Sequence, residues 1–436
     1  MLLVSLLLVA PAVLAVSVPA SESPHDHPVK RSLGARWYHD EHHPVYNLFR
    51  RGGQTDGITY PAVGSLTWGA NFPKSTPDSG QLPQAWVDAL NVAVNTGKIP
   101  DVPVAEQEHG ADPKYPGHDP MSPEICSSTY KCISSAAWWD GPEGYFASSF
   151  DDGPQPTTDK LLTFLQEKNV HTTHFMIGVN ILQYWSEFVK TFEAGDDIAV
   201  HTYTHPYMTT LSNEEVVAQL GWTMELIHNS TGGRVPRFWR PPYGDSDNRV
   251  TAIAKEVFGL ETVIWNEDTE DWSLGSGGTT LETIAKQMQE WLSRPKSPGL
   301  VVLEHEDSDD ALNAFIDAFP KVLESGWKFE SLARLFGQGQ AYQNSNDNNS
   351  EVKPYDIMAG PNNGSMIMAQ SSMAASSGPS SSDSGSPTAG NLAASSPTPE
   401  IAANAAASGW DRASSLQWIL TTMLGASVMT AVTLWV

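Results

Sequence analysis

Short apolar runs alternate with amphipathic segments of helical period from position 145 to position 329. The runs are rich in aromatic, β-branched and small residues, a composition typical of buried strands. The segments between them place apolar side chains three and four positions apart, which is the spacing of one helix face. In segment 180–194, for example, Ile181, Trp185 and Phe188 fall on the same face. The predicted strands are 146–150, 172–177, 198–200, 237–240, 262–265, 300–303 and 327–329, and the predicted helices are 159–168, 180–194, 214–229, 248–258, 280–293 and 310–324.

The order of these elements predicts an α/β fold. Strands that alternate with helices form a parallel sheet, and the seven predicted strands and six predicted helices of this chain are too few for a closed eight-stranded barrel. We therefore expect a distorted, incomplete (β/α)7 barrel. Segment 21–138 has no clear pattern apart from a helix at 83–93. We expect it to be an irregular N-terminal extension that packs against the barrel.

Both ends of the chain carry signals of targeting rather than of a folded core. Residues 1–20 are apolar and end in small residues, as a secretory signal peptide does. Segment 337–403 is dominated by Ser, Ala, Gly and Pro and cannot bury enough apolar surface to fold, which predicts a disordered stalk. Small residues from Asn404 onward and the uncharged apolar tail indicate a glycosylphosphatidylinositol (GPI) attachment signal at 404–436. A membrane-spanning helix is the alternative, but no basic cluster flanks the tail, which favours the GPI signal.

Net charge limits the class of partner, and the cysteines and sequons suit a secreted protein. The chain has 50 acidic and 25 basic residues and a formal net charge of −25, which argues against a nucleic acid partner because phosphate binding needs Lys and Arg. Cys126 and Cys132 are the two cysteines, and their proximity in a secreted chain predicts one disulfide. Sequons of the form N-x-[ST] are glycosylation acceptors of secreted proteins, and they occur at Asn229, Asn348 and Asn363.

Polar clusters follow five of the predicted strands at the point where each strand ends. The first is F-D-D-G at 150–153, whose two adjacent carboxylates leave the strand on opposite sides. Taken alone, this segment also suits an ordinary turn. The carboxyl ends of parallel strands meet on one face of a barrel, where active sites are built, so we expect all five clusters to converge. The other four are H-T-Y-T-H at 201–205, R-P-P-Y at 240–243, N-E-D-T-E-D-W at 266–272 and E-H-E at 304–306.

His201 and His205 are the best candidates for metal ligands. Two imidazoles and one carboxylate leave open positions for water and substrate, as in catalytic zinc sites. The two carboxylates Asp151 and Asp152 then suit a divided task, in which one binds the metal and the other accepts a proton. The alternative is an accidental histidine spacing, with His205 and the proline after it simply ending a strand.

The five motifs F-D-D-G, H-T-Y-T-H, R-P-P-Y, D-T-E-D-W and L-E-H together resemble those of the NodB-type polysaccharide deacetylases, carbohydrate esterase family 4. The resemblance covers about 139–336 and says nothing of the extension before it. It implies one divalent metal ion, zinc or cobalt, held by Asp152, His201 and His205.

The same resemblance implies roles for the remaining site residues. Asp151 would be the general base that deprotonates water, and His305 would be the general acid that protonates the leaving amine. The residues alone leave a core-packing role open for Trp272 and a surface ion pair open for Arg240. In the family pattern, Arg240 fixes Asp151, the backbone N–H of Tyr243 helps to hold the oxyanion, Asp271 orients His305, and Trp272 lines the acetyl pocket.

The resemblance implies an enzyme that hydrolyses N-acetyl groups of a polysaccharide and releases acetate. The chain is most similar to the fungal family members that convert chitin, the β-1,4-linked polymer of N-acetylglucosamine, into chitosan. An O-acetyl xylan esterase and a non-catalytic, wall-anchored chitin-binding protein are the alternatives. We expect a secreted monomer that is held at the plasma membrane and cell wall by its GPI anchor. The expected order along the chain is signal peptide 1–20, N-terminal extension or propeptide 21–138, deacetylase domain 139–336, linker 337–403 and GPI signal 404–436.

Overall fold

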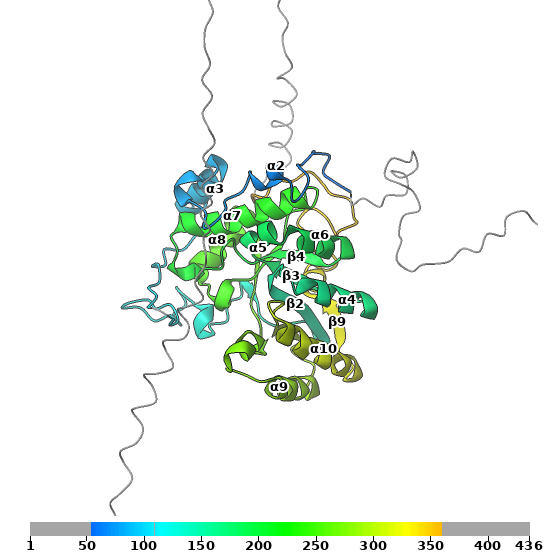
Figure 1. Ribbon diagram of the computed structural model, residues 1–436. Coiled ribbons are helices and arrows are strands. Elements are labelled where there is room, and N and C mark those ends of the chain that lie inside the picture. Colours follow the sequence, from blue (N-terminus) through cyan, green and yellow to red (C-terminus); the bar gives the residue numbers. More distant parts are fainter. Residues whose placement is uncertain (1–53, 109, 360–436) are drawn as a thin grey trace, which may run out of the picture. The chain divides into compact units, whose positions relative to one another are not determined.

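The computed structural model describes residues 54–108 and 110–359, which are drawn as coloured ribbon in Figure 1. The predicted signal peptide, the GPI attachment site at Asn404 and the sequon at Asn363 lie outside these residues. Within the described ranges, no helix is long and apolar enough to cross a membrane. The disulfide between Cys126 and Cys132 is formed, as the sequence predicts.

The fold is built on one sheet whose neighbouring strands all run parallel. Its centre is β2 (Tyr145–Gly153), which pairs through its first half with β8 (Leu300–Leu303) and through its second half with β3 (Thr173–Met176). The strand order is β1-β6-β5-β4-β3-β2-β8-β7, and β9 pairs with the first half of β2. All seven predicted strands are present. The remaining strands are β1 (Ala137–Trp138), β4 (Asp197–Val200), β5 (Phe238–Trp239), β6 (Glu261–Val263), β7 (Glu267–Asp268) and β9 (Lys328–Ser331).

The barrel is incomplete between β6 and β8, which confirms the predicted fold class. No strand ladder joins these two strands in the described chain, and Asn266 bridges the gap instead. Its backbone N–H donates to the carbonyl of Val301 (3.0 Å), and its Nδ2 donates to the carbonyl of Gly299 (2.8 Å). Its Oδ1 accepts from the N–H of Val301 (2.9 Å). One side chain therefore takes the place of strand pairing and fixes the start of the 266–272 loop.

Helices flank the strands (Figure 1). The longest, α7 (Asn213–Ser230), begins with a capping box in which Ser212 accepts from the N–H of Glu215 and the Glu215 carboxylate accepts from the N–H of Ser212. The predicted helix 180–194 is in fact two helices, because Tyr184 leaves the helical conformation (φ −113°, ψ 45°). The apolar spacing continues across this break, so periodicity does not reveal it. The other α-helices are α2 (Leu66–Gly69), α3 (Gln84–Asn95), α4 (Thr158–Lys168), α5 (Gly178–Gln183), α6 (Trp185–Ala194), α8 (Asn248–Phe258), α9 (Leu281–Ser293), α10 (Asp309–Glu324) and α11 (Leu332–Phe336).

The N-terminal extension is part of the folded core. Its helix α3 lies beside α7 and α8 (Figure 1). The ring of Trp86 on α3 is buried and packs edge-on against the rings of Trp222 (5.2 Å) and Phe258 (5.9 Å). A side chain at position 221 would collide with Trp86, so Gly221 lets the indole approach α7. Burial of one large apolar side chain stabilises a fold by about 1.5–3 kcal/mol, and the extension therefore packs against the barrel as predicted.

The predicted disordered stalk begins too early, because residues 338–359 fold against the barrel. Tyr342 is fully buried. Its hydroxyl accepts from the N–H of Ile198 at the start of β4 (3.2 Å) and donates to Oδ1 of Asn348 (2.9 Å). The segment is polar in composition, but it folds because hydrogen bonds satisfy its buried polar groups and the ring of Tyr342 anchors it in the core.

Arg234 ties both ends of the described domain together. Its guanidinium is buried and donates to the carbonyls of Gln54 (3.0 Å), Asn348 (2.9 Å) and Ser350 (3.1 Å). A buried charge is costly unless its donors are satisfied. Backbone carbonyls satisfy it here, and a low-complexity sequence gives no sign of such a partner.

Two of the three sequons lie within the described residues. Nδ2 of Asn348 donates to the carbonyls of Phe192 (2.8 Å) and Asp196 (2.7 Å), and the residue is buried. The folded domain therefore has no room for a glycan at Asn348, and the prediction there is wrong. Asn229, near the end of α7, is only partly buried, and its Nδ2 donates to Glu225 (3.0 Å). A glycan at Asn229 stays a prediction.

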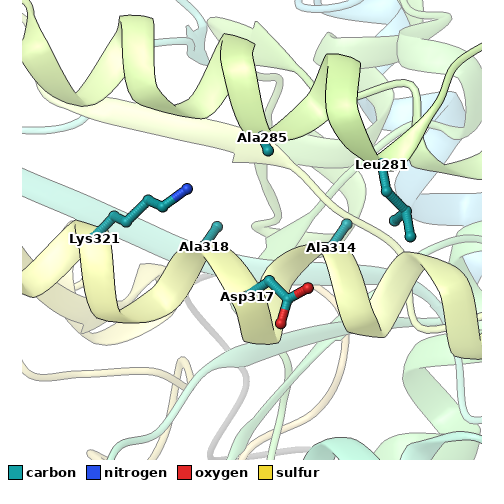
Figure 2. Close-up of a pocket in the computed structure, with 6 residues that line it drawn as sticks. All are labelled: Leu281, Ala285, Ala314, Asp317, Ala318 and Lys321. Carbon is teal, nitrogen blue, oxygen red and sulfur yellow. The ribbon is translucent and has the colours of Figure 1, made fainter.

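A small cavity of about 40 Å³ separates α9 from α10 (Figure 2). The methyl groups of Ala285, Ala314 and Ala318 are too short to fill the space between the two helices. A volume of this size holds little more than a water molecule. No residue that lines it belongs to the polar clusters at the strand ends.

Candidate active site

The five polar clusters predicted from the sequence lie at the carboxyl ends of the strands. The first and last clusters are joined directly, since the N–H of Asp151 donates to the carbonyl of Glu304 (2.9 Å) and the N–H of Glu306 donates to the carbonyl of Asp151 (3.2 Å). In a parallel sheet these ends form a single rim. Asp151 and Asp152 end β2, His201 follows β4, Arg240 follows β5, Asp271 follows β7, and His305 follows β8.

Asp152, His201 and His205 form a group whose ligand atoms all lie within 4.8 Å of one another. Oδ1 of Asp152 lies 3.3 Å from Nε2 of His201 and 3.2 Å from Nε2 of His205, yet it has no hydrogen-bond partner. Nδ1 of His201 donates to the carbonyl of Arg240 (2.8 Å), so its Nε2 presents a lone pair in the neutral ring. Electron-rich atoms this close need a positive charge between them. Two imidazoles and one carboxylate are the ligand set of a zinc-type cation with open positions.

The pKa of Asp152 suits a ligand. Burial alone would raise the pKa of its carboxyl group, but the neighbouring imidazoles of His201 and His205 outweigh burial and hold the pKa well below its ordinary value. The carboxylate is therefore ionised at neutral pH, and metal ligands must be deprotonated.

Left-handed backbone conformations concentrate in the loops that carry the ligands. Asp152 has a φ of 69°, and a β-bulge shifts the pairing of β2 with β3 between Asp151 and Gly153. Such a φ is uncommon for a residue with a side chain and costs about 1–3 kcal/mol. The bulge replaces the simple strand alternation that the sequence suggests for the two carboxylates. Thr202 (φ 63°) and His205 (φ 61°) are also left-handed, and so is Tyr243 (φ 60°) in the R-P-P-Y loop.

Asp151 is held by a buried ion pair. Nη1 of Arg240 donates to its Oδ1 at 2.7 Å, and both side chains are buried. The guanidinium carbon lies 4.3 Å from the ring centroid of Phe175, in cation–π contact. The other carboxylate oxygen, Oδ2, faces Nε2 of His201 at 3.8 Å. This arrangement excludes a surface ion pair for Arg240 and aims one oxygen of Asp151 at the ligand group.

His305 is paired with Asp271 at the end of β8. Nδ1 of His305 donates to Oδ1 of Asp271 (2.6 Å), and the backbone N–H of His305 donates to Oδ2 (2.8 Å). Burial alone would lower the pKa of His305, but the charge and hydrogen bond of Asp271, with smaller contributions from Asp152 and Asp151, raise it to about 10. The imidazole is therefore protonated at neutral pH and can donate a proton.

The exposed ring of Tyr243 borders the ligand group. Tyr243 stacks on Tyr207 with ring centroids 4.0 Å apart and planes 11° apart, and it meets the ring of His205 edge-on at 4.7 Å. Trp272 is 58% exposed, which excludes the core-packing alternative for its indole. Aromatic side chains beside a few oriented polar groups are typical of a site for an organic ligand.

A second carboxylate–imidazole pair, which the sequence analysis missed, lies against the D-D-G turn. Oε1 of Glu306 lies 2.7 Å from Nδ1 of His174, and its Oε2 accepts from the hydroxyl of Thr158 (2.5 Å). Glu306 and His174 are fully buried. A Cβ at position 153 would collide with this carboxylate, so Gly153 is required beside the ligand Asp152. The E-H-E cluster pointed to Glu306, but nothing in the sequence marks His174 as its partner.

This arrangement combines a cation site, a buried carboxylate base and a protonated imidazole on one rim. A base that accepts a proton from water and an acid that supplies one to a leaving group are the groups needed to hydrolyse an acyl bond. Each occupies a separate environment. Asp151 faces the guanidinium of Arg240, and His305 faces the carboxylate of Asp271.

Similarity to known proteins includes the strands from β2 to β6, which lead to the ligand group and to Arg240. The family model described as polysaccharide deacetylase matches residues 140–263. Chitin deacetylase 3 of Cryptococcus neoformans is 38% identical over 330 residues, which cover 74% of this chain and 78% of that protein. Chitin deacetylase 1 of Saccharomyces cerevisiae is 39% identical over 201 residues, 45% of this chain and 63% of that protein. A family 4 carbohydrate esterase from Streptomyces lividans, solved in complex with acetate, is 30% identical and covers 43% of this chain and 91% of that chain, with a TM-score of 0.37.

Proposed function

Because the chain belongs to the polysaccharide deacetylase family, we propose that it hydrolyses the N-acetyl groups of chitin, releasing acetate and leaving chitosan. The names of these two relatives support this substrate. The observation that carries the proposal is the convergence of the group Asp152, His201 and His205 with the buried base Asp151. The same groups would serve an O-acetyl esterase, so the sugar has to be tested directly.

The ligand group would hold one divalent cation, zinc or cobalt, through Oδ1 of Asp152 and Nε2 of both histidines. Such a cation lowers the pKa of water to about 7 and polarises a carbonyl group. His201 is prepared for this role, because its hydrogen bond to the carbonyl of Arg240 fixes the tautomer and the ring orientation. Partners of this kind behind a ligand are a regular feature of metal sites.

The proton transfers belong to the protein's own side chains. Asp151 takes a proton from the attacking water, and the hydrogen bond from Arg240 orients its carboxylate. The backbone N–H of Tyr243 donates to the oxygen that becomes negative as the carbonyl carbon turns tetrahedral. His305 gives its proton to the amide nitrogen as the C–N bond breaks, so that nitrogen leaves as an amine. Asp271 holds the imidazolium in place.

A substrate comparison tests the proposal. Purified full-length protein is incubated with chitin oligomers and, in parallel, with acetylated xylan, and released acetate is measured. We expect acetate from chitin oligomers at a kcat/KM well above that for xylan. Acetate from xylan alone would favour the O-acetyl esterase. If neither substrate yields acetate, the protein is a binder rather than an enzyme on these polymers.

Asp271→Asn is expected to move the alkaline limb of the kcat profile to lower pH by about 1–3 units. The active His305 is protonated, so activity is lost as pH rises through its pKa. The Asp271 charge raises that pKa against the effect of burial, and the neutral amide no longer does so. A bound cation lowers the pKa of His305 in both proteins, so their difference remains. The measurement is kcat against pH at saturating substrate.

The control for this shift is Asp307→Asn, which removes an exposed carboxylate near His305. No hydrogen bond joins the side chains of Asp307 and His305 in the described structure. The alkaline limb of the kcat profile should therefore move much less in Asp307→Asn than in Asp271→Asn. An unchanged alkaline limb in Asp271→Asn would mean that His305 is not the acid.

The reaction would take place at the cell surface in cell wall biogenesis. The apolar segment 1–20 and the small-then-apolar segment 404–436 support secretion and GPI anchoring. Treatment of membranes with a phosphatidylinositol-specific phospholipase tests this location. Retention of the protein on the membranes after treatment would argue against the anchor.

A further inference from the structure

Two loops of the rim meet at one buried carboxylate. Loop 201–211 carries both imidazole ligands, and loop 240–248, which ends in the first residue of α8, carries Tyr243. Asp245 of the second loop is fully buried. Its Oδ2 accepts from the N–H of Thr209 (2.8 Å), and both of its oxygens lie 2.9 Å from the Thr209 hydroxyl. This junction links the backbone of one rim loop to a side chain of the other.

The N-terminal extension completes the junction. Oγ1 of Thr129 donates to Oδ1 of Asp245 at 2.8 Å, and Thr129 lies inside the loop closed by the disulfide of Cys126 and Cys132. Among the described residues, no Lys, Arg or His forms an ion pair with Asp245. Burial raises the pKa of Asp245 to about 6, while its hydrogen bonds from Thr209 and Thr129 act to lower it. The ionised carboxylate therefore depends on these neutral donors.

The same part of the extension also binds the neighbouring backbone of both rim loops. The N–H and the hydroxyl of Ser128 both donate to the carbonyl of Ser246 at 2.8 Å. The N–H of Ala105 donates to the carbonyl of Thr209 (2.9 Å). These contacts flank Asp245 on one loop and reach Thr209 on the other.

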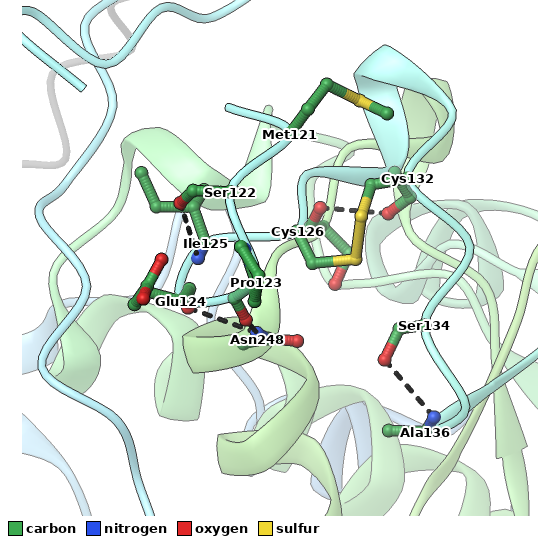
Figure 3. Close-up of a disulfide and its surroundings, with 12 residues drawn as sticks. Met121, Ser122, Pro123, Glu124, Ile125, Cys126, Cys132, Ser134, Ala136 and Asn248 are labelled. Atoms are coloured by element: carbon green, nitrogen blue, oxygen red, sulfur yellow. Dashed lines mark hydrogen bonds between the residues drawn. A yellow bond between two sulfur atoms is a disulfide. The ribbon is translucent and has the colours of Figure 1, made fainter. Parts of the chain in front are cut away.

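Figure 3 shows the next contact along the chain, beside the disulfide. Nδ2 of Asn248 donates to the carbonyls of Pro123 (2.9 Å) and Glu124 (3.0 Å), and its backbone N–H donates to the carbonyl of Ile125 (2.9 Å). Tyr115 donates from its hydroxyl to Asp247 (2.9 Å). The second rim loop is thus bound by the extension from position 245 to position 248.

We propose that segment 115–132, together with Ala105, is a working part of the active site, which positions the two rim loops through the cluster of Thr129, Asp245 and Thr209. The proposal rests on the proposed function only in that these are the loops of the deacetylase site. It assigns a task to the extension and argues against its removal as a propeptide. Thr129, Asp245 and Thr209 are positioning residues, because they act through the groups that face the substrate.

The site groups that a change in this cluster would displace lie close to it in the sequence. Tyr243 is two residues before Asp245, and its ring stacks on Tyr207, two residues before Thr209. His205 and Tyr243 are both in left-handed backbone conformations, which persist only when their surroundings hold them. Loosening the cluster should displace the N–H of Tyr243 and the ring of His205. A displacement of about 1 Å at a catalytic group can cost as much as about 10²-fold in rate.

The test compares Thr129→Val with wild type in the full-length protein. Valine keeps the shape of threonine and removes the hydroxyl donor. We expect kcat on chitin oligomers to fall by about tenfold, with KM within about twofold because the exposed binding surface stays. Thr129→Ser restores the donor and should recover most of kcat. Thr96→Val, the same change at the exposed end of α3 in the same extension, should leave kcat unchanged.

Two further measurements distinguish a loss of loop positioning from other causes of lower activity. In the Asp245→Asn background, Thr129→Val should add little to the loss, because coupled residues are not additive. Amide hydrogen exchange in peptides 201–211 and 240–248 should rise in Thr129→Val and not in Thr96→Val. Exchange needs no activity, so it tests the positioning even if wild type releases no acetate, the result that would remove the proposed function. Wild-type kcat together with wild-type exchange in Thr129→Val would overturn the proposal.

Discussion

Replacing Asp151 with asparagine is expected to lower the kcat of acetate release by about 10²–10⁴-fold, the usual contribution of one general acid or base. The amide keeps the shape of the side chain but cannot take up a proton from water near neutral pH. The ligand atoms of Asp152, His201 and His205 are not altered, so Zn²⁺ should still bind. The measurement is kcat at saturating chitin oligomer, together with a Zn²⁺ titration of the metal-free protein.

The same substitution also affects the fold, because Arg240 is fully buried and Asp151 is its carboxylate partner. Breaking one side of a buried ion pair costs about 3–5 kcal/mol of unfolding free energy. Asp197→Asn is a matched control. Asp197 is buried and lies 2.8 Å from Nε of Arg334, but it begins β4, at the end of the strand away from the site.

We expect Asp197→Asn to lower Tm while kcat per folded molecule stays within about twofold, and Asp151→Asn to lose kcat whatever its Tm. Equal loss of kcat per folded molecule in the two variants would show that the effect of Asp151 is structural. Wild-type turnover by Asp151→Asn would remove it as the base.

Loss of the metal is expected to have a comparable effect. A chelator should lower acetate release by about 10²-fold or more, since the stabilisation that a catalytic metal supplies is several kcal/mol. Adding Zn²⁺ or Co²⁺ should restore activity. His205→Ala should prevent restoration at the same metal concentration, because it removes one of three ligand atoms that lie within 4.8 Å of one another. Acetate release and the affinity for Zn²⁺ are both measured.

Binding of metal should also raise Tm in wild type, because a ligand that binds only the folded state stabilises it. This rise should be lost in His205→Ala. His171→Ala is the control: its imidazole is partly exposed and faces Asp196 at 3.4 Å, outside the ligand group. Full activity after exhaustive chelation would contradict the metal requirement.

Strand positions and rim clusters were predictable from the sequence for a physical reason. A parallel strand must be apolar along its length, whereas its carboxyl end opens onto solvent and can carry polar groups. Asp151 and His305 therefore stand out at the ends of apolar runs. The two-residue strands β1 and β7 were not predicted from the sequence.

The relations among site residues were less predictable. Strand alternation suggests that Asp151 and Asp152 face apart, but the bulge and the left-handed φ of Asp152 change the direction of the second carboxylate. The pairing of Glu306 with His174 joins residues 132 positions apart, and it depends on packing that no local pattern encodes. The task of the extension was hidden for the same reason, since Thr129 is an ordinary residue until Asp245 lies beside it.

The predicted start of the disordered linker at 337 is wrong because composition alone does not determine whether a segment is ordered. Segment 337–403 reads as low complexity, yet Tyr342 and Asn348 within it are buried and bonded. A few anchors are enough to order a polar segment when backbone groups supply the remaining bonds.

The contacts of Arg234 show at which end of the barrel the described chain begins and ends. The carbonyl of Gln54 accepts a hydrogen bond from Arg234, which lies four residues before the start of β5. The N–H of Ala359 donates to the carbonyl of Val257, which lies four residues before the start of β6. Both flanks thus emerge at the base of the barrel, where the strands start, whereas the chemistry sits where they finish. A tether on either flank would therefore attach to the end of the barrel opposite the candidate active site.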